Sequence, residues 1–360
     1  MKKTCLVLLG LLWCAALPAK NFELKSPDGR IALAIDVGER IAYTVRGDGI
    51  PLLEECRLGL RLDRGGTAGP LRLVRHRSGS IDRTFRPAVA YKFSEIRDRC
   101  NTLRLDFRGG WSVEFRAYDD GVAYRFLSDT EGPVEVLGEE FALRLPDAST
   151  AVLQQPGSFR TGYEEAYEEV GTRSWGTAGR LAVLPALFDT KRGYKILVSE
   201  SSLTDYPCLF LTGDGANGMR GVFPKMPLRT EETGDRSVRI LEEAGCIAAT
   251  TGERAFPWRY FVLADEDGDL VETTMTARLA EPCALGDTSW IEPGQVSWEF
   301  WNAASPYGPD VDFVAGFNTA TYKYFIDFAA RFGIPYIIMD EGWSASTTDV
   351  FHPNPDLDLQ

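Results

Sequence analysis

The chain has 360 residues, of which 44% are hydrophobic and 25% are charged, a balance typical of a globular protein that buries a core. Its 39 Lys and Arg side chains stand against 52 Asp and Glu, so the formal net charge is −13. That charge argues against a nucleic-acid partner, because binding to phosphates depends on cationic groups. With only His76 and His352 and no HExxH or CxxC motif, the sequence also argues against catalytic zinc.

Residues 1–19 have the pattern of a secretory signal peptide. Lys2 and Lys3 precede an apolar run that ends in small residues, so we expect cleavage after Ala19 and export to the periplasm. No later stretch reaches the roughly 18 apolar residues that a membrane-spanning helix needs, and we expect no membrane span.

From residue 20 to about residue 285 the sequence alternates short strands with turns. Residues 103–108 place apolar side chains at every second position, the period of a strand with one solvated face. Turn pairs such as Asp28-Gly29 and Gly109-Gly110 recur between the strands, as antiparallel connections require. The pattern predicts a mainly β protein with a large N-terminal β-sandwich over residues 20–285.

The pattern changes in residues 290–360. Residues 296–301 are typical of a strand, and Asn318 or Thr319 is placed to cap a helix that ends at Gly333. The apolar run 335–340 is typical of a strand that is buried in a parallel sheet. Strand, helix and strand make one βαβ unit, the way a (β/α)8 barrel begins. Such a barrel needs roughly 250 residues, so we expect the first unit of an incomplete barrel.

The second of these strands ends in a group of residues suited to sugar binding. Asp340, Glu341 and Trp343 lie where barrel active sites are found, at the carboxyl end of a strand. Carboxylates accept hydrogen bonds from hydroxyl groups, and an indole face packs on pyranose C–H groups. Neighbouring side chains point to opposite sides, so the two acids cannot serve together as the acid and base across one bond. Capping of a helix is the alternative role for either acid.

Two tryptophans, Trp298 and Trp301, lie on the first barrel strand. Either could form a sugar platform or belong to the core. Trp301 is the better candidate for a sugar contact, because it lies closer to the carboxyl end of the strand.

Two acidic positions could bind a hard cation. Glu200 ends the apolar strand 195–199, which would place its carboxylate at the rim of a sheet. Glu164 lies in an acidic run around Tyr163, for which a solvated surface is the simpler interpretation.

Seven stretches that follow one another along the chain resemble sequences of glycoside hydrolase family 97, a family of exported α-glucosidases and α-galactosidases. The resemblance covers nearly all of the chain after the signal peptide. The matching stretches are SPDGRIAL from Ser26, EFRAYDDGVAYRF from Glu114, YEEAY from Tyr163, LVSESSLTDYP from Leu197, PWRYFVLAD from Pro257, DTSWIEPGQVSWEFWN from Asp287 and YFIDFAARFGIPYIIMDEGW from Tyr324.

The resemblance implies a β-super-sandwich followed by a catalytic (β/α)8 barrel, and an oligosaccharide or α-glycoside as substrate. It also implies a catalytic Ca²⁺ with one carboxylate ligand from the N-terminal domain, for which Glu200 is the best match and Glu164 the second. In the family the general acid and the base or nucleophile lie on later barrel strands, so we expect the catalytic residues beyond Gln360. The chain by itself is then expected to be inactive.

Two other functions remain open at this stage. One is a non-catalytic carbohydrate-binding β-sandwich module with a vestigial barrel segment. The other is a structural or adhesive β-sandwich that binds no sugar.

Overall fold

The computed structural model describes residues 19–67, 69–89, 91–175, 180–215, 218–234, 237–340, 342–346, 349–355 and 357. Contacts group the chain into two compact units. The first comprises Met1–Phe85, Ile96–Met226 and Gly245–Glu281, and the second comprises Arg86–Glu95, Pro227–Ala244 and Pro282–Gln360. The predicted signal peptide lies outside the described residues except for Ala19. No helix in the described ranges is long and apolar enough to cross a membrane.

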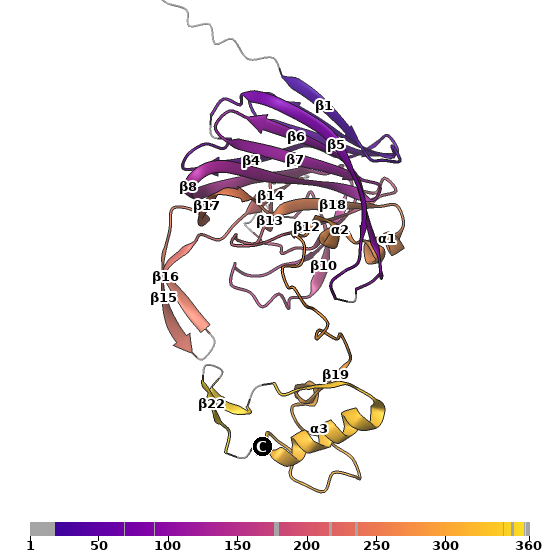
Figure 1. The fold of residues 1–360 in the computed structure, drawn as a ribbon, viewed down its shortest axis with the longest axis vertical. Helices are drawn as coiled ribbons and strands as arrows, with labels where there is room; N and C mark the ends of the chain where they lie inside the picture. Colours follow the sequence, from indigo (N-terminus) through magenta and orange to yellow (C-terminus); the bar gives the residue numbers. More distant parts are fainter. Residues whose placement is uncertain are drawn as a thin grey trace, which may run out of the picture. The chain divides into compact units, whose positions relative to one another are not determined.

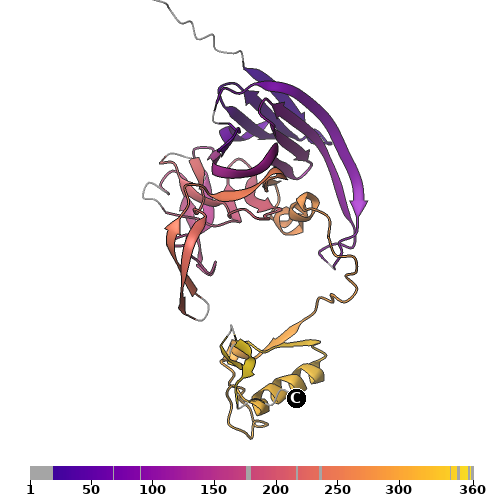
Figure 2. The ribbon, with the colours of Figure 1, turned by 60° about the vertical axis from the view of Figure 1, so that its left-hand side comes forward.

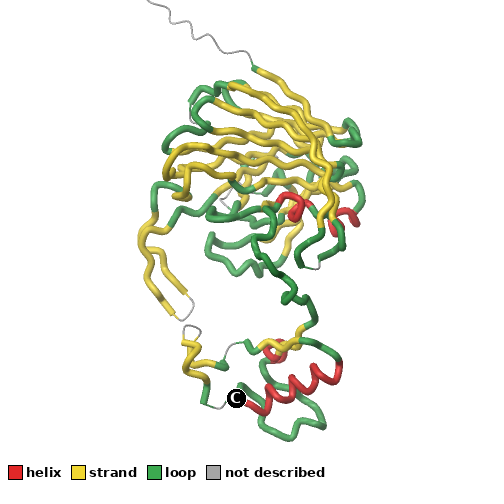
Figure 3. Tube along the Cα trace, viewed as in Figure 1, coloured by secondary structure: helices red, strands yellow, loops and turns green. Residues whose placement is uncertain are grey.

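The first unit is built from a 16-stranded sheet whose paired strands are antiparallel, and it confirms the predicted β-sandwich (Figure 1, Figure 3). Two short helices follow its last strand. The elements are β1 (Lys20–Lys25), β2 (Ile31–Val37), β3 (Ile41–Gly47), β4 (Ile50–Leu62), β5 (Leu73–Phe85), β6 (Ile96–Phe107), β7 (Trp111–Tyr118), β8 (Gly121–Arg144), β9 (Thr150–Gln154), β10 (Tyr167–Gly171), β11 (Ala186–Asp189), β12 (Lys195–Ser201), β13 (Phe210–Gly213), β14 (Gly218–Val222), β17 (Ala248–Ala255), β18 (Trp258–Ala264), α1 (Asp267–Glu272) and α2 (Met275–Leu279).

Strand β8 connects the parts of this sheet. It is 24 residues long and pairs with β4, β7, β14, β17 and β18 along different stretches. Its first residue must be Gly121, because a Cβ there would collide with the carbonyl oxygen of Phe261 on β18. The close approach of β8 and β18 therefore depends on a residue without a side chain.

The core of the first unit follows from the period-two pattern that the sequence predicts. Along β2 every second side chain is buried, and the strands around it alternate in the same way. Aromatic rings meet in the middle of this core. Phe261 stacks on Phe141 with ring centroids 6.1 Å apart and lies within 6.4 Å of Tyr43 and Tyr124. Rings from β3, β8 and β18 thus bury one another and hold the sandwich together.

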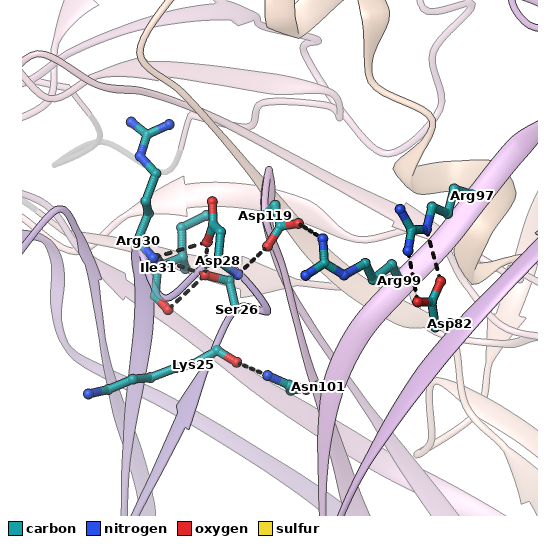
Figure 4. Close-up of polar contacts among 10 residues, drawn as sticks. All are labelled: Lys25, Ser26, Asp28, Arg30, Ile31, Asp82, Arg97, Arg99, Asn101 and Asp119. Carbon is teal, nitrogen blue, oxygen red and sulfur yellow. Dashed lines mark hydrogen bonds and ion pairs between the residues drawn. The ribbon is translucent and has the colours of Figure 1, made fainter.

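One rim of the sandwich joins segments that are far apart in the sequence (Figure 4). In the turn before β2, the Ser26 hydroxyl donates to Asp28 Oδ1 at 2.5 Å and accepts from the Ile31 amide at 3.0 Å. The Asp28 amide donates to Asp119 Oδ1 at 2.9 Å, and Arg99 donates to Asp119 Oδ2 at 3.4 Å. Two of the stretches that carry the family resemblance therefore meet at this rim.

The second unit contains two antiparallel strand pairs and a βαβ unit (Figure 2, where the latter runs from orange to yellow). Strands β19 and β20 pair in parallel, with Val296 opposite Tyr336 and Trp298 opposite Ile338, and α3 connects them. This confirms the predicted βαβ unit. The elements are β15 (Pro227–Gly234), β16 (Ser237–Glu243), β19 (Val296–Trp298), the 3-10 helix η1 (Glu299–Asn302), α3 (Thr319–Phe332), β20 (Tyr336–Ile338), β21 (Ser344–Ser346) and β22 (Asp349–Pro353).

Helix α3 begins and ends as its sequence predicts. The Asn318 side chain caps the first turn by accepting from the Thr321 amide at 3.0 Å. Gly333 ends the helix with φ 66°, the left-handed conformation that glycine adopts without strain. The aromatic side chains of the helix are covered only in part, because Tyr322 is buried whereas Phe332 is 60% exposed.

The strand predicted over residues 296–301 is shorter in the structure. Strand β19 ends at Trp298, and Glu299 begins η1, so Trp301 lies on a helical turn rather than on a strand. At this point the buried Glu299 side chain, instead of its backbone, bonds to the chain after the neighbouring strand, so the ladder does not continue.

We expect limited chymotrypsin digestion to cut first after about residue 285. Residues 281–287 are all exposed and belong to no helix or strand, and Trp290 is 71% exposed. The strands of the 16-stranded sheet before them are held by two hydrophobic clusters. Mass spectrometry of the first fragments should find an intact product of residues 20 to about 285. Cleavage at equal rates on both sides of this segment would contradict the prediction.

Candidate functional site

The carboxyl ends of β19 and β20 carry a group of interacting polar side chains in the second unit. Glu299, the first residue after β19, has its side chain buried. Its Oε1 accepts from the Asp340 amide at 2.6 Å and from the Tyr322 hydroxyl of α3 at 3.1 Å. Burial and the neighbouring Glu299 carboxylate raise the pKa of Tyr322 well above its ordinary value, so the phenol remains a donor.

Asp340 is also bonded through its side chain. The indole Nε1–H of Trp298 donates to Asp340 Oδ2 at 2.8 Å. Around this bond the Trp298 ring lies 5.9 Å from Phe300 and 6.0 Å from Trp301, centroid to centroid. Trp298 is 37% exposed and Trp301 is 84% exposed. A carboxylate next to accessible aromatic faces is the combination that binds sugars, since hydroxyl groups need acceptors and C–H groups need apolar surface.

Of the four residues predicted for sugar binding, the structure places three in different surroundings. Asp340 lies just after β20 and Trp301 lies on η1 just after β19, and the exposure of Trp301 removes it from the core. Asp340 caps no described helix and bonds to Trp298 and Glu299 instead. Trp343 is half-buried, and its carbonyl accepts from the Asn354 amide at 2.8 Å. Glu341 lies outside the described residues.

Glu200, the predicted metal ligand, lies in the first unit within a buried ion-pair network rather than at an open rim. Strand β12 continues to Ser201, so Glu200 is not its last residue, and it faces Arg259 of β18 in register. Arg259 Nη1 donates to Glu200, while Arg259 Nε and Nη2 bind both oxygens of Glu139 at 2.8 Å. Tyr206 completes the network by donating to Glu139 Oε2 at 3.0 Å. Arg259 and Glu139 are almost inaccessible, and the Glu200 side chain is 12% exposed.

The network contains two carboxylates and one guanidinium. Burial raises the pKa of the Glu200 carboxyl, although the charge of Arg259 opposes the shift. Apart from Arg259, the described contacts of Glu200 are long ones, from the Leu209 amide at 3.3 and 3.4 Å. Its surplus negative charge and oxygen chemistry fit one ligand of a hard cation. The described residues contain no group of three or more His, Cys, Asp and Glu side chains that could hold a metal ion.

The acidic run around Tyr163 has the character of a solvated surface. Glu164, Glu165, Glu168 and Glu169 are exposed. Gln155 donates to Glu168 at 2.6 Å, a local contact between strand β10 and the loop after β9. Nothing among the described residues brings these acids together around one point.

Sequence reasoning missed three important residues. Glu299 is a charged residue next to an apolar strand, in a stretch interpreted as strand throughout. Its signal was available, because an acid directly after a barrel strand lies at the functional edge. Tyr322 is one of several aromatic residues on α3, and the sequence does not mark it as the one whose hydroxyl bonds to Glu299. Arg259 had no such signal, since one arginine among apolar residues does not reveal its partners 59 and 120 residues away in the chain.

The fold and these sites define a protein with a large antiparallel β-sandwich and a βαβ unit that carries polar and aromatic side chains at its strand ends. A family model described as glycosyl-hydrolase 97 N-terminal matches residues 24–282, and a second, glycoside hydrolase 97, matches residues 298–360. The chain belongs to glycoside hydrolase family 97.

Two curated relatives extend this finding. The chain is 35% identical over 374 residues to a retaining α-galactosidase of Bacteroides thetaiotaomicron, an alignment that covers 100% of this chain and 56% of the relative. It is 30% identical over 322 residues to a probable retaining α-galactosidase of Streptomyces bingchenggensis, covering 88% of this chain and 45% of the relative. The chain therefore spans about half the length of the curated relatives it matches.

Solved structures share the fold. A family 97 enzyme from Pseudoalteromonas sp. strain K8, solved in complex with panose, superposes with a TM-score of 0.75 at 22% identity, covering 94% of this chain and 51% of that one. The same enzyme has been solved with acarbose. A β-arabinopyranosidase superposes with a TM-score of 0.75 at 25% identity, covering 91% of this chain and 52% of that one.

We expect Arg259→Met to lower the free energy of unfolding by about 3–5 kcal/mol at neutral pH, because it leaves two buried carboxylates without a cation. The loss should shrink as the pH falls to about 5. Without the opposing charge of Arg259 the pKa of Glu200 rises further, so the folded variant takes up protons more readily than the unfolded chain.

Denaturant titrations at the two pH values measure both effects. Arg254→Met is the matched control, because Arg254 is also shielded but its acidic partner Asp205 is largely exposed. It should cost less, with little dependence on pH. An equal loss for Arg259→Met at both pH values would contradict the electrostatic explanation.

Proposed function

We propose that the chain is the N-terminal part of an exported, calcium-dependent α-glycoside hydrolase that acts on α-galactosides. The descriptions of the two curated relatives favour galactosides over glucosides. The signal-peptide pattern of residues 1–19 supports export.

One observation carries the proposal for the substrate. Asp340 and Trp298 bond to each other at the carboxyl ends of two parallel strands, the edge at which barrel enzymes bind their substrates. A carboxylate has about four acceptor sites, so Asp340 keeps capacity for sugar hydroxyls after accepting from Trp298. The exposed ring of Trp301 offers an apolar face for a pyranose.

The described residues supply substrate contacts rather than the acid and nucleophile. A retaining glycosidase uses two carboxyl groups about 5–5.5 Å apart on either side of the scissile bond. Glu299 is buried and bonded to Tyr322 and Asp340, so it does not face a substrate. The family resemblance assigns the acid and the nucleophile to later barrel strands.

Glu200 is the residue of this chain that would bind Ca²⁺ in the complete site. Its support is the surplus negative charge of the network around Arg259. A bound Ca²⁺ would polarise the site and orient the substrate and the general acid. Arg259 holds the Glu200 carboxylate in one orientation, and Glu139 neutralises the other side of the guanidinium.

We expect a polypeptide of these 360 residues to leave p-nitrophenyl α-galactoside unhydrolysed. The described residues supply no acid and base pair, and loss of such a pair removes a factor of about 10²–10⁴ for proton transfer alone. The DNA beyond codon 360 provides the comparison, because an in-frame continuation to the length of the relatives should encode an active protein. Turnover by the 360-residue chain that survives repurification and disappears in Asp340→Asn would overturn this division of roles.

The 360-residue chain and the extended protein also distinguish the hydrolase from a carbohydrate-binding module. If the extended protein binds methyl α-D-galactopyranoside but hydrolyses no α-galactoside or α-glucoside, the carbohydrate-binding module is the better description. If neither protein binds a sugar, a structural β-sandwich is favoured.

We expect calorimetry with the 360-residue chain to show only weak Ca²⁺ binding, in the millimolar range by comparison with the weakest dedicated sites, since one carboxylate cannot supply six to eight oxygens. The extended protein should bind Ca²⁺ tightly and lose that binding in Glu200→Ala. Glu164→Ala is the control and should bind normally. Loss of binding in Glu164→Ala, with retention in Glu200→Ala, would move the ligand to the acidic run.

A further inference from the structure

The geometry points to Glu299 as a positioning residue that holds Asp340 and Trp298 in the arrangement that a sugar would meet. This inference rests on the proposed function and deepens it. It assigns a role to a buried side chain that touches no substrate itself.

Glu299 extends the parallel strand pair beyond its last backbone partners. The ladder ends where Trp298 faces Ile338. The chain then turns into η1, so the backbone of Glu299 no longer follows the strand. The Glu299 carboxylate replaces the backbone as hydrogen-bond acceptor, because Oε1 accepts the Asp340 amide hydrogen at 2.6 Å. A side chain thereby fixes the backbone of β20 two residues past the ladder.

Two consecutive residues, Trp298 and Glu299, bond to Asp340. Asp340 is the acceptor in the first bond and the donor in the second. It donates its amide hydrogen to Glu299 and accepts the indole hydrogen of Trp298 on its carboxylate at 2.8 Å. One bond sets the position of the Asp340 backbone, and the other sets the direction of its carboxylate. Because Trp298 and Glu299 are adjacent, a displacement of Glu299 changes both bonds.

Helix α3 is fixed to the same oxygen. The buried Tyr322 hydroxyl donates to Glu299 Oε1 at 3.1 Å. The carboxylate oxygen that holds Asp340 therefore also anchors the helix that connects the two strands. Loss of the tyrosine hydroxyl alone should loosen Glu299 without removing its bond to Asp340.

The second oxygen of Glu299 makes the role testable. Oε2 is buried and has no hydrogen-bond partner among the described residues. Glutamine keeps an acceptor at Oε1 and replaces only this unpartnered oxygen. Glu299→Gln should therefore preserve the positioning that Glu299→Ala destroys.

The experiment follows the indole N–H resonances of the 360-residue chain in ¹⁵N–¹H correlation spectra, during titration with methyl α-D-galactopyranoside. Trp298→Phe assigns the resonance of Trp298. Trp175, whose indole donates to Gln155 at 2.7 Å in the first unit, is the internal reference for the fold. Asp327→Ala is the matched control, an exposed acid on α3.

In Glu299→Ala we expect the Trp298 resonance to move toward that of an unbonded indole, and the galactoside affinity to fall about tenfold or more. Tyr322→Phe should move the resonance in the same direction by less. Glu299→Gln and Asp327→Ala should match the unmodified chain, and the Trp175 resonance should stay constant throughout.

The inference is wrong if Glu299→Ala leaves both the Trp298 resonance and the affinity unchanged, or if Glu299→Gln is as damaging as Glu299→Ala. If Glu299→Ala fails to fold, Tyr322→Phe and Glu299→Gln decide the question by the same resonance. If the unmodified chain shows no response to galactoside, the proposed sugar site fails, while the resonance still reports whether Glu299 positions Trp298.

Discussion

The β-sandwich depends on a buried ion network centred on Arg259. Its guanidinium binds both oxygens of Glu139 near the end of β8, and one oxygen of Glu200 on β12. The backbone of Arg259 pairs with Tyr124 near the start of the same β8. One residue therefore contacts both ends of the longest strand, and this is possible only if β8 bends through the sandwich. Moving Glu139 or Glu200 away from Arg259 would leave a shielded carboxylate without a cation.

The second unit also has a buried carboxylate that accepts hydrogen bonds from other elements. Glu299 is buried where the strand pair ends, and it takes hydrogen bonds from β20 and from α3. In the first unit Glu139 and Glu200 bind Arg259 across strands that backbone ladders already join, whereas Glu299 adds its bonds just beyond the end of a ladder. In the first unit Glu200 is itself the proposed Ca²⁺ ligand. In the second unit Glu299 lies next to Asp340 and Trp298, the residues proposed to contact a sugar. Rigid polar networks of this kind hold binding groups in place before a ligand arrives.

Much of the fold could be predicted because its signals are local. The alternation in β2, the Asn318 cap and the Gly333 stop each depend on a few neighbouring residues, and the structure has each of them. The strand over residues 296–301 was predicted too long for the same reason. A local pattern treats Glu299 as one polar position in a strand, whereas its conformation is decided by Tyr322 and Asp340, which come 23 and 41 residues later.

By itself the sequence determined the class of this protein: a large antiparallel β unit, then one βαβ unit with Asp340 and a nearby tryptophan at the strand ends. These features follow from side-chain periodicity and turn chemistry, which act over a few residues. Only the tertiary structure decided that Glu200 is paired with Arg259 and that Trp298 rather than Trp301 bonds to Asp340. Such pairings depend on which segments become neighbours and on how much water they exclude. Neither follows from the spacing of residues along the chain.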